Sequence, residues 1–242
     1  NTIITWDDHA NIKMPVGGLD SEAAVKGKPM GTFRTYTLKV QGSYITLKNI
    51  TIENNAAKLG QAVSLHLEGD HILVQNCRLL GNQDTVYTGI ANNRSAFYDC
   101  YIEGTTDFIF GPGRAWFENC EIRSKANSYI TAASSPAGQE YGYVFNKCKL
   151  TAEPGIDKVY LGRPWRPYAA TLFMNCEMGS HIRPEGWHNW GKQSNEQTAR
   201  YSEYNNHGAG AATKARVAWS RQLTKKEAAK VTIKNVFGEE AW

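Results

Sequence analysis

The sequence predicts an all-β solenoid, a parallel β-helix, because one short pattern occurs six times along its 242 residues. Each copy has an apolar residue three positions before its centre and another two positions after it. Apolar residues at the centre and two positions later have the period of a strand with one buried face. No copy continues the i, i+3, i+4, i+7 pattern of an amphipathic helix, which disfavours a helical solenoid. The six centres are Ile50, Cys77, Cys100, Cys120, Cys148 and Cys176.

The columns of this repeat predict where its residues lie. We expect the residues three before each centre in the core, namely Leu47, Val74, Phe97, Phe117, Phe145 and Phe173. We expect the residues directly before each centre to stack at a turn, namely Asn49, Asn76, Asp99, Asn119, Lys147 and Asn175. The five cysteines contain no CxxC pair, and their spacing favours a ladder of buried thiols. If a bridge forms, Cys100–Cys120 is the expected one, because adjacent turns bring the two residues within disulfide range.

Composition and charge exclude several classes of protein. Hydrophobic residues make up 41% and charged residues 21% of the chain, as in a soluble globular protein. The net charge of +4 is spread along the sequence, which argues against nucleic-acid binding and would suit an acidic polymer. No apolar run is long enough for a membrane span, and the first residues do not form a signal peptide. A mature secreted chain or a fragment would begin in the same way, and we expect a secreted or periplasmic monomer.

Before the second copy of the repeat, the sequence predicts one irregular segment and two strands. Ala10–Thr32 is rich in glycine and charge, which is typical of a loop that leaves an early turn of the solenoid. Strand alternation returns at Tyr36–Val40 and again at Tyr44–Ile52. Further along, Ala132–Gly142 predicts a longer insertion between two strands.

Beyond Arg183 the repeat fades. Glu185–Gly191 has two tryptophans in a loop flanked by glycine, and Ser202–Thr213 predicts irregular structure because it is rich in glycine, alanine and asparagine.

The last twenty residues predict a helix followed by a strand. Leu223–Lys230 has the start signal of a helix, with Thr224 as N-cap and Glu227 completing a capping box. A final strand is expected at Val231–Val236. We therefore expect one domain over residues 1–242, in which a tail formed by residues 196–242 packs on the solenoid or caps its end.

Two aspartates occupy the same offset from the repeat, since Asp84 follows Cys77 by seven residues and Asp107 follows Cys100 by seven. Equivalent positions on adjacent turns lie about 4.8 Å apart, so the two side chains should be stacked neighbours. Two carboxyl groups this close cannot both ionise freely, and we expect one pKa to rise and the other to fall. Such a pair supplies an acid together with a base or nucleophile, and Arg163 is a candidate partner for the ionised member. The residues alone also allow a solvated pair on a surface turn.

Four short segments surround these residues in the sequence: Gly60-Gln61-Ala62-Val63, Gln83-Asp84-Thr85-Val86-Tyr87, Asp107-Phe108-Ile109-Phe110-Gly111 and Leu161-Gly162-Arg163-Pro164-Trp165. They closely resemble the four signature segments of pectin methylesterases, in the order and at the spacing of that family. The resemblance implies a right-handed parallel β-helix. It also implies an enzyme that removes methyl groups from esterified galacturonate in pectin, leaving a carboxylate and methanol, without a cofactor.

The resemblance gives roles to residues of these segments. Asp107 resembles the nucleophile, and Asp84 resembles the general acid that later acts as base. Arg163 resembles the residue that holds the nucleophile, and an arginine stabilises the ionised form that a nucleophile needs. The amides that resemble the family's oxyanion donors are Gln61 and Gln83. Trp165 resembles a residue that contacts the sugar, and the other aromatic residues that would stack on sugar rings, or else lie in the core, are Tyr87, Phe110, Trp187 and Trp190.

The chain departs from the family pattern at its start, and other functions stay open at this point. Family members usually begin with further turns that include a Gly-x-Tyr segment, so the chain is either a fragment or is completed by another segment. A β-helical glycosidase or lyase is one alternative, because retaining glycosidases also use two carboxyl groups about 5 Å apart. A catalytically inactive carbohydrate-binding solenoid is another. The histidines show no metal-ligand spacing, so no metal is expected.

Overall fold

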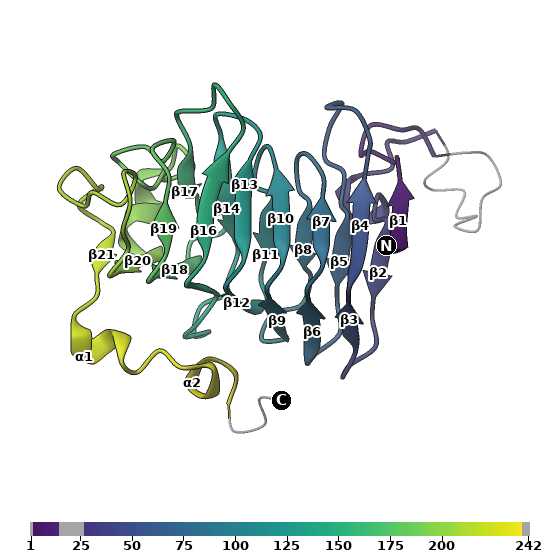
Figure 1. The fold of residues 1–242 in the computed structure, drawn as a ribbon. Coiled ribbons are helices and arrows are strands. Elements are labelled where there is room, and N and C mark those ends of the chain that lie inside the picture. Colours follow the sequence, from purple (N-terminus) through teal and green to yellow (C-terminus); the bar gives the residue numbers. More distant parts are fainter. Residues whose placement is uncertain (1, 15–26, 239–242) are drawn as a thin grey trace.

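The computed structural model describes residues 2–14 and 27–238, in which parallel strands form three sheets. Successive turns of the chain add strands to the same sheets, so neighbouring strands in a sheet come from successive turns (Figure 1). The named strands of this part of the chain pair in parallel with their neighbours. The predicted parallel β-helix is therefore confirmed.

The first sheet has the strands β1 (Thr2–Trp6), β4 (Ile50–Asn54), β7 (Arg78–Leu80), β10 (Tyr101–Gly104), β13 (Glu121–Ser124), β16 (Lys149–Ala152) and β19 (Glu177–Met178). The second sheet has β2 (Leu38–Val40), β5 (Leu65–Leu67), β8 (Val86–Thr88), β11 (Ile109–Gly111), β14 (Tyr129–Ala133) and β17 (Tyr160–Gly162). The third sheet has β3 (Thr46–Lys48), β6 (Ile72–Gln75), β9 (Arg94–Tyr98), β12 (Arg114–Glu118), β15 (Tyr143–Asn146), β18 (Ala170–Met174), β20 (Arg200–Tyr204) and β21 (Arg221–Gln222). Within residues 2–14 and 27–238, two 3₁₀ helices lie in connections, η1 (Thr32–Arg34) and η2 (Gln193–Gln197).

The column of mostly asparagine residues forms the turn between the third and the first sheet, as predicted. Its six members have left-handed backbones, with φ between 50° and 58°. Asn and Asp adopt this conformation more readily than other non-glycine residues. Their side chains also bond along the column, since Asn76 Nδ2 donates to Asn49 Oδ1 at 2.7 Å and Asn119 Nδ2 donates to Asp99 Oδ1 at 2.6 Å. Because this turn reaches the cysteines, the strand expected at each cysteine begins one residue later.

The phenylalanine and cysteine columns fill the interior of the solenoid. The rings of Phe97, Phe117, Phe145 and Phe173 stack on successive turns, with centroids 4.5, 4.4 and 4.3 Å apart. All five cysteines are buried and free, so the ladder of thiols is confirmed and no Cys100–Cys120 bridge is present.

The N-terminal strands are shorter than expected. Within Tyr36–Val40, only β2 is strand. Within Tyr44–Ile52, Tyr44 has a left-handed backbone with φ 59° and Asn49 forms a turn, so the segment divides between β3 and β4. The described part of Ala10–Thr32 is irregular apart from an antiparallel bridge between Lys13 and Pro29 and the first residue of η1, and residues 15–26 lie outside the described residues.

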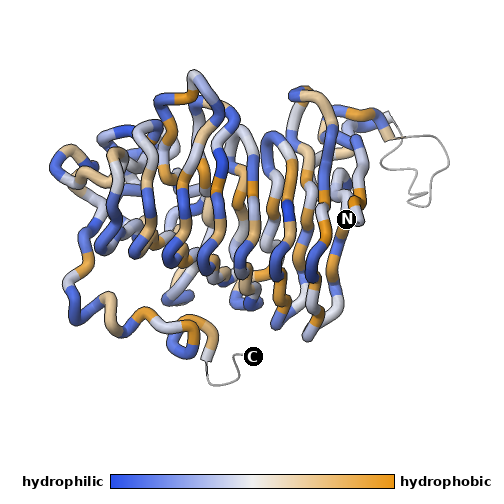
Figure 2. Tube along the Cα trace, viewed as in Figure 1, coloured by the Kyte–Doolittle hydropathy of each residue, from blue (hydrophilic) through white to orange (hydrophobic). Residues whose placement is uncertain are grey.

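The C-terminal helix is confirmed, but the final strand is wrong. Helix α1 (Lys225–Ala228) begins after Thr224, and Thr224 and Glu227 form the expected capping box. The segment expected as a strand instead forms helix α2 (Ile233–Phe237), capped by Thr232, whose Oγ1 accepts a hydrogen bond from the Asn235 N–H at 3.2 Å. The apolar residues Ile233 and Val236, which suggested a strand, pack on the third sheet together with Phe237. Figure 2 shows apolar positions along α2, which lies beside this sheet.

Helix α2 is held on the third sheet by two arginines on adjacent turns. Arg94 Nη1 donates to the carbonyl of Phe237 at 3.0 Å, and Arg114 Nη1 donates to that of Val236 at 2.9 Å. Val236 and Phe237 are buried against this sheet. The limits of a separate tail at residues 196–242 stay a prediction.

The solenoid also continues further than expected, because β20 occupies part of Ser202–Thr213. This strand pairs with β18 and adds to the third sheet. The reason lies in Tyr201, which is buried in the core and stacks on Trp187 at 4.3 Å. No helix in the described part of the chain is both long and apolar enough to cross a membrane.

We expect the cysteines of the folded protein to resist alkylation, because burial raises the pKa of the Cys120 and Cys148 thiols and shields the column from solvent. Mass spectrometry after iodoacetamide treatment should find almost no label in the native protein and five labels after denaturation with urea. Labelling of Cys120 or Cys148 in the native protein would show that the assigned interior column is wrong.

Candidate active site

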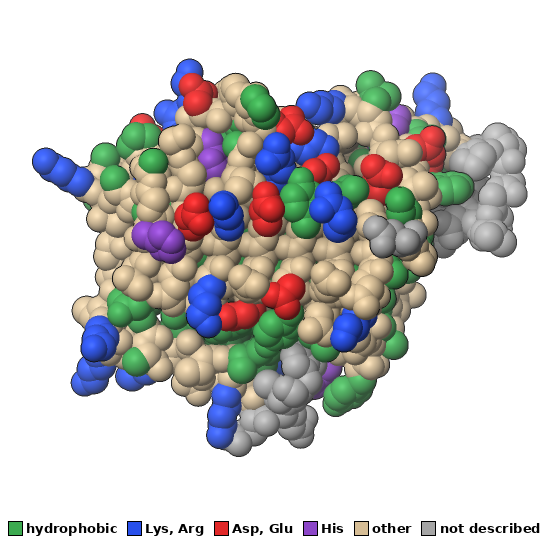
Figure 3. All heavy atoms as spheres, in the orientation of Figure 1, with side chains coloured by type: hydrophobic (Ala, Val, Ile, Leu, Met, Phe, Trp, Pro, Cys, Tyr) green, Lys and Arg blue, Asp and Glu red, His purple; other side chains and the backbone are tan. Residues whose placement is uncertain are grey.

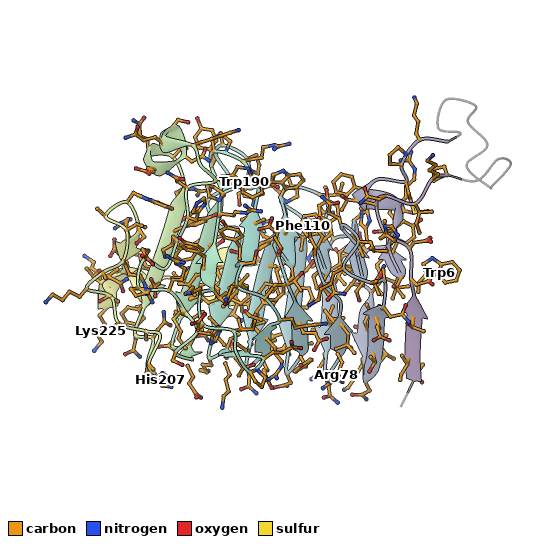
Figure 4. All side chains as sticks on the ribbon, turned by 90° about the horizontal axis from the view of Figure 1, so that it is seen from above. Trp6, Arg78, Phe110, Trp190, His207 and Lys225 are labelled. Atoms are coloured by element: carbon orange, nitrogen blue, oxygen red, sulfur yellow. The ribbon has the colours of Figure 1, made fainter. Side chains whose placement is uncertain are left out.

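Two faces of the solenoid differ in chemistry. Over the first sheet, cationic and acidic side chains are interspersed (Figure 3), and they include pairs such as Lys149–Glu177 at 3.5 Å. Seen from above, Phe110 and Trp190 project from the side opposite Arg78 (Figure 4). This second side carries the outer face of the second sheet, where the four signature segments converge.

The aspartate pair, Asp84 and Asp107, is stacked on adjacent turns, as its shared offset predicted. The two residues lie just before β8 and β11, whose register pairs Val86 with Ile109. The ladder extends back to the aspartates, because the Asp84 N–H donates to the Thr106 carbonyl at 3.1 Å. Both have left-handed backbones, with φ 68° and 51°. Asp tolerates this conformation, and such residues gather at functional sites in many proteins.

One pocket of about 300 Å³ brings together the five predicted catalytic residues and three of the five aromatic candidates. Tyr87 does not line it, but its ring packs on Phe110 with centroids 4.6 Å apart. The predicted residues that line the pocket are Gln61, Gln83, Asp84, Asp107, Phe110, Arg163, Trp165 and Trp190, and the others are Thr32, Phe33 and Ala132.

Three of these pocket residues were missed, namely Thr32, Phe33 and Ala132. Two aromatic candidates are now distinguished. Thr32 and Phe33 belong to η1, in a segment that shows no repeat, so no sequence signal placed them at the site. Of the two loop tryptophans, Trp190 lines the pocket, whereas Trp187 is buried in the core of the solenoid.

Arg163 holds Asp107 through two parallel hydrogen bonds. Its Nε donates to Oδ1 at 3.0 Å and its Nη2 donates to Oδ2 at 2.7 Å. The preceding residue, Gly162, lies so close to β14 that an added Cβ would collide with the side chain of Thr131. A glycine at this position therefore lets the strand approach closely and brings Arg163 within reach of the aspartate pair.

Burial raises the pKa of both aspartates, which corrects the expectation that one would fall. Asp84 is 8% and Asp107 5% exposed, and loss of solvent disfavours the charged form of each. Burial, followed by the charge of Asp107, holds the pKa of Asp84 well above its ordinary value, and Arg163 offsets this only in part. Burial also raises the pKa of Asp107, but the hydrogen bonds and charge of Arg163 oppose it directly. Asp84 is thus the better proton donor, and Asp107 the better anion.

Comparison with known proteins places the chain in a family. Residues 7–240 match the family model for pectinesterase. The chain is 39% identical over 229 residues to pectinesterase 31 of Arabidopsis thaliana. The aligned region covers 94% of this chain and 70% of that protein.

The chain belongs to the pectinesterase family. Its relatives are carboxylic ester hydrolases, so the enzyme class and the family that the motifs indicated are confirmed. The chain spans 58% of the length of another relative, pectinesterase QRT1 of Arabidopsis thaliana.

Solved structures of pectin methylesterases share the fold. The enzyme from carrot superposes with a TM-score of 0.85 at 29% identity, covering 100% of this chain and 75% of the carrot chain. A pectin methylesterase crystallised in complex with a hexasaccharide superposes with a TM-score of 0.80 at 28% identity, covering 98% of this chain and 80% of that one.

We expect Asp84→Asn to raise the free energy of unfolding of this pectinesterase at neutral pH. The unfolded chain releases the Asp84 proton near pH 4, whereas the folded protein retains it to higher pH because the pKa is raised. The wild type therefore loses stability as the pH rises between these two values. The gain at neutral pH should be about 1.4 kcal/mol for each tenfold difference in proton affinity between the two states, and it should vanish at about pH 4 or below.

Urea unfolding at pH 4 and pH 7 measures this difference. The exposed Asp7 gives a matched control, because Asp7→Asn should leave the pH dependence of the wild type unchanged. An Asp84→Asn protein whose stability depends on pH as steeply as the wild type would contradict the argument.

Proposed function

We propose that this pectinesterase removes methyl groups from methyl-esterified galacturonate in pectin through a covalent acyl-Asp107 intermediate. The observation that carries the proposal is the asymmetry of the aspartate pair. Asp107 accepts two hydrogen bonds from Arg163, while Asp84 is buried beside it and holds its proton more tightly. One buried site thus offers an anion that can attack and an acid that can donate.

In the first step, a carboxylate oxygen of Asp107 attacks the carbonyl carbon of the ester and forms an acyl-enzyme anhydride. Negative charge develops on the former carbonyl oxygen. Gln61 and Gln83 come from adjacent turns, as shown by the Ala62 N–H that donates to the Gln83 carbonyl at 3.0 Å, and both line the pocket. Their amides are the proposed donors to this oxyanion, and loss of one such donor typically lowers the rate about 10²- to 10³-fold.

Asp84 moves the protons in both steps. It first protonates the departing methoxide oxygen, which leaves as methanol, and it is then a carboxylate. In the second step it takes a proton from a water molecule, which attacks the anhydride, releases the galacturonate carboxyl and regenerates Asp107. Asp84 gives up one proton in the first step and takes one back in the second, so it ends in its starting state.

The aromatic residues around the aspartate pair are the proposed contacts to the sugar chain. Phe33, Phe110, Trp165 and Trp190 line the pocket, and Tyr87 packs between Phe33 and Phe110. Aromatic faces suit the apolar faces of sugar rings. The hexasaccharide complex of a related pectin methylesterase supports a chain-like ligand here. We also propose that the enzyme acts as a monomer, outside the cell or in the periplasm.

Incubation with methylated pectin should release methanol without forming new reducing ends or unsaturated products. The reason is that the proposed attack is on the ester carbon and leaves the glycosidic bonds intact. Alcohol-oxidase detection measures the methanol, and reducing-end and ultraviolet assays follow chain cleavage. Cleavage without methanol would instead support a glycosidase or a lyase, and binding without either product would support an inactive carbohydrate-binding protein.

The two aspartates should differ on a nitrophenyl ester of galacturonate, whose leaving group needs no proton. Asp84→Asn keeps the nucleophile, so it should give a burst of nitrophenolate near one equivalent and then stall, because no base activates water. Asp107→Asn should give no burst on any ester. On methylated pectin, loss of the proton donor should lower the rate about 10²- to 10⁴-fold. A burst from Asp107→Asn and silence from Asp84→Asn would mean that the two roles are exchanged.

A further inference from the structure

Arg163 reaches Asp107 across a whole turn of the solenoid. Arg163 follows β17 and Asp107 precedes β11, with β14 between these strands in the second sheet. The strands β17 and β11 are therefore two strand spacings, about 9.6 Å, apart. The guanidinium group has to cross the intervening turn in one conformation, and long side chains lose much rotamer freedom when they are fixed.

Two aromatic rings hold the guanidinium group on this path. Its Cζ lies 3.9 Å from the ring centroid of Tyr129 and 3.9 Å from that of Trp190. Two rings at this distance would overlap if they shared one face of the planar group, so they enclose it from two sides. A cation is attracted to an aromatic face, more strongly where water is excluded. This ring sandwich, Tyr129 and Trp190, fixes the plane in which Arg163 donates.

Tyr129 comes from the turn that Arg163 crosses. Its carbonyl accepts the Asp107 N–H at 2.8 Å, so one residue contacts both members of the ion pair. Its ring is supported by Tyr160 of the next turn, with centroids 5.3 Å apart and planes 13° apart. Tyr129 does not line the pocket of the aspartate pair, so an effect on the reaction would run through Arg163.

Trp190 comes from a loop that is anchored in the core. Trp187 is buried and stacks on Tyr201, and the His188 N–H donates to the Gly162 carbonyl at 3.1 Å. Trp190 itself has a left-handed backbone with φ 63°, and its N–H donates to His188 Nδ1 at 3.0 Å. Trp187 therefore anchors the loop in the core, and Trp190 lies outside it on the side of Phe110 (Figure 4).

We propose that Tyr129 is a positioning residue for the nucleophile, which acts with Trp190 to hold Arg163 so that both of its hydrogen bonds reach Asp107. The proposal rests on the proposed role of Asp107. The sandwich keeps water from both faces of the guanidinium group, which strengthens its attraction for the carboxylate. Without the Tyr129 ring, Arg163 populates several conformations, and fewer molecules present an ionised and oriented Asp107.

The groups around Asp107 set the sign of the expected pH effect. Arg163 is the cation bonded to it, Asp84 is the carboxyl group on the preceding turn, the Tyr129 phenol belongs to the following turn, and the Tyr201 phenol lies inside the solenoid. When the hydrogen bonds of Arg163 to Asp107 are weakened, two effects on Asp107 remain, namely its burial and the neighbouring Asp84 carboxyl group. Both favour the protonated form of Asp107. In the pH profile of kcat, the limb on the acid side should therefore move to higher pH.

Two substitutions of Tyr129 separate its ring from its hydroxyl group. Tyr129→Leu removes the ring and should lower kcat for methanol release roughly 3- to 30-fold, as expected for loss of one cation–π contact. KM should stay near the wild-type value, and the acid limb should move to higher pH. Tyr129→Phe retains the ring and should restore wild-type kcat and pH dependence.

A matched control lies on the first sheet, where Arg78 sits 4.1 Å over the Tyr101 ring. Tyr101→Leu removes a similar contact far from the site and should change neither kcat nor the acid limb. If thermal unfolding shows that Tyr129→Leu does not fold, Trp190→Leu decides the question. It should move the acid limb in the same direction, together with a change in KM because Trp190 lines the pocket.

A wild-type protein that releases methanol, together with an unchanged acid limb in the folded Leu variants, would overturn the proposal. A wild type that releases no methanol contradicts the proposed function instead. In that case, carbon-13 NMR of labelled aspartate carboxyl groups still measures the pKa of Asp107. A rise in Tyr129→Leu but not in Tyr129→Phe supports the positioning role, and equal values in both variants refute it.

Discussion

In-register stacking of successive turns is the constraint on which the rest of this pectinesterase chain depends. When each residue faces one residue on the next turn, a repeated side chain becomes a column with a spacing of about 4.8 Å. The same register stacks phenylalanine rings 4.3 to 4.5 Å apart and lines up left-handed asparagine turns. It also brings Asp84 beside Asp107, although these residues belong to different turns. The core and the aspartate pair thus have one geometric cause.

Stacking two carboxyl groups in a buried site creates an electrostatic cost that the chain offsets on one side only. Of the two aspartates, only Asp107 accepts hydrogen bonds from Arg163. The positive charge of Arg163 lowers the pKa of Asp84 only in part. Two equivalent positions of the repeat thereby become chemically different. Arg163 is 56 residues from Asp107 in the sequence, yet two strand spacings away in the solenoid, so the parallel register also delivers the residue that breaks the symmetry.

The parts that recur in the sequence were predictable, and the parts that occur once were not. The cysteine, phenylalanine and asparagine columns repeat, so their period revealed the interior, the turn and the stacked aspartates. Helix α2 occurs once, and its apolar residues fit a strand as well as a helix turn until the face that they cover is known. Phe33 reaches the pocket from η1, where no repeat defines a register. The rise of both aspartate pKa values was missed because it depends on burial, which an offset in the sequence does not measure.

The two loop tryptophans show why a side chain at this site cannot be assigned from its type alone. Trp187 and Trp190 are three residues apart, and in a regular strand an odd separation would place them on opposite faces. The loop is not a strand, however, and the left-handed backbone of Trp190 and its hydrogen bond to His188 decide where the second ring points. That ring meets a guanidinium group that already faces Tyr129. The position of Trp190 therefore depends on the core that holds Trp187, and the orientation of the Arg163–Asp107 pair depends in turn on residues from three separate turns.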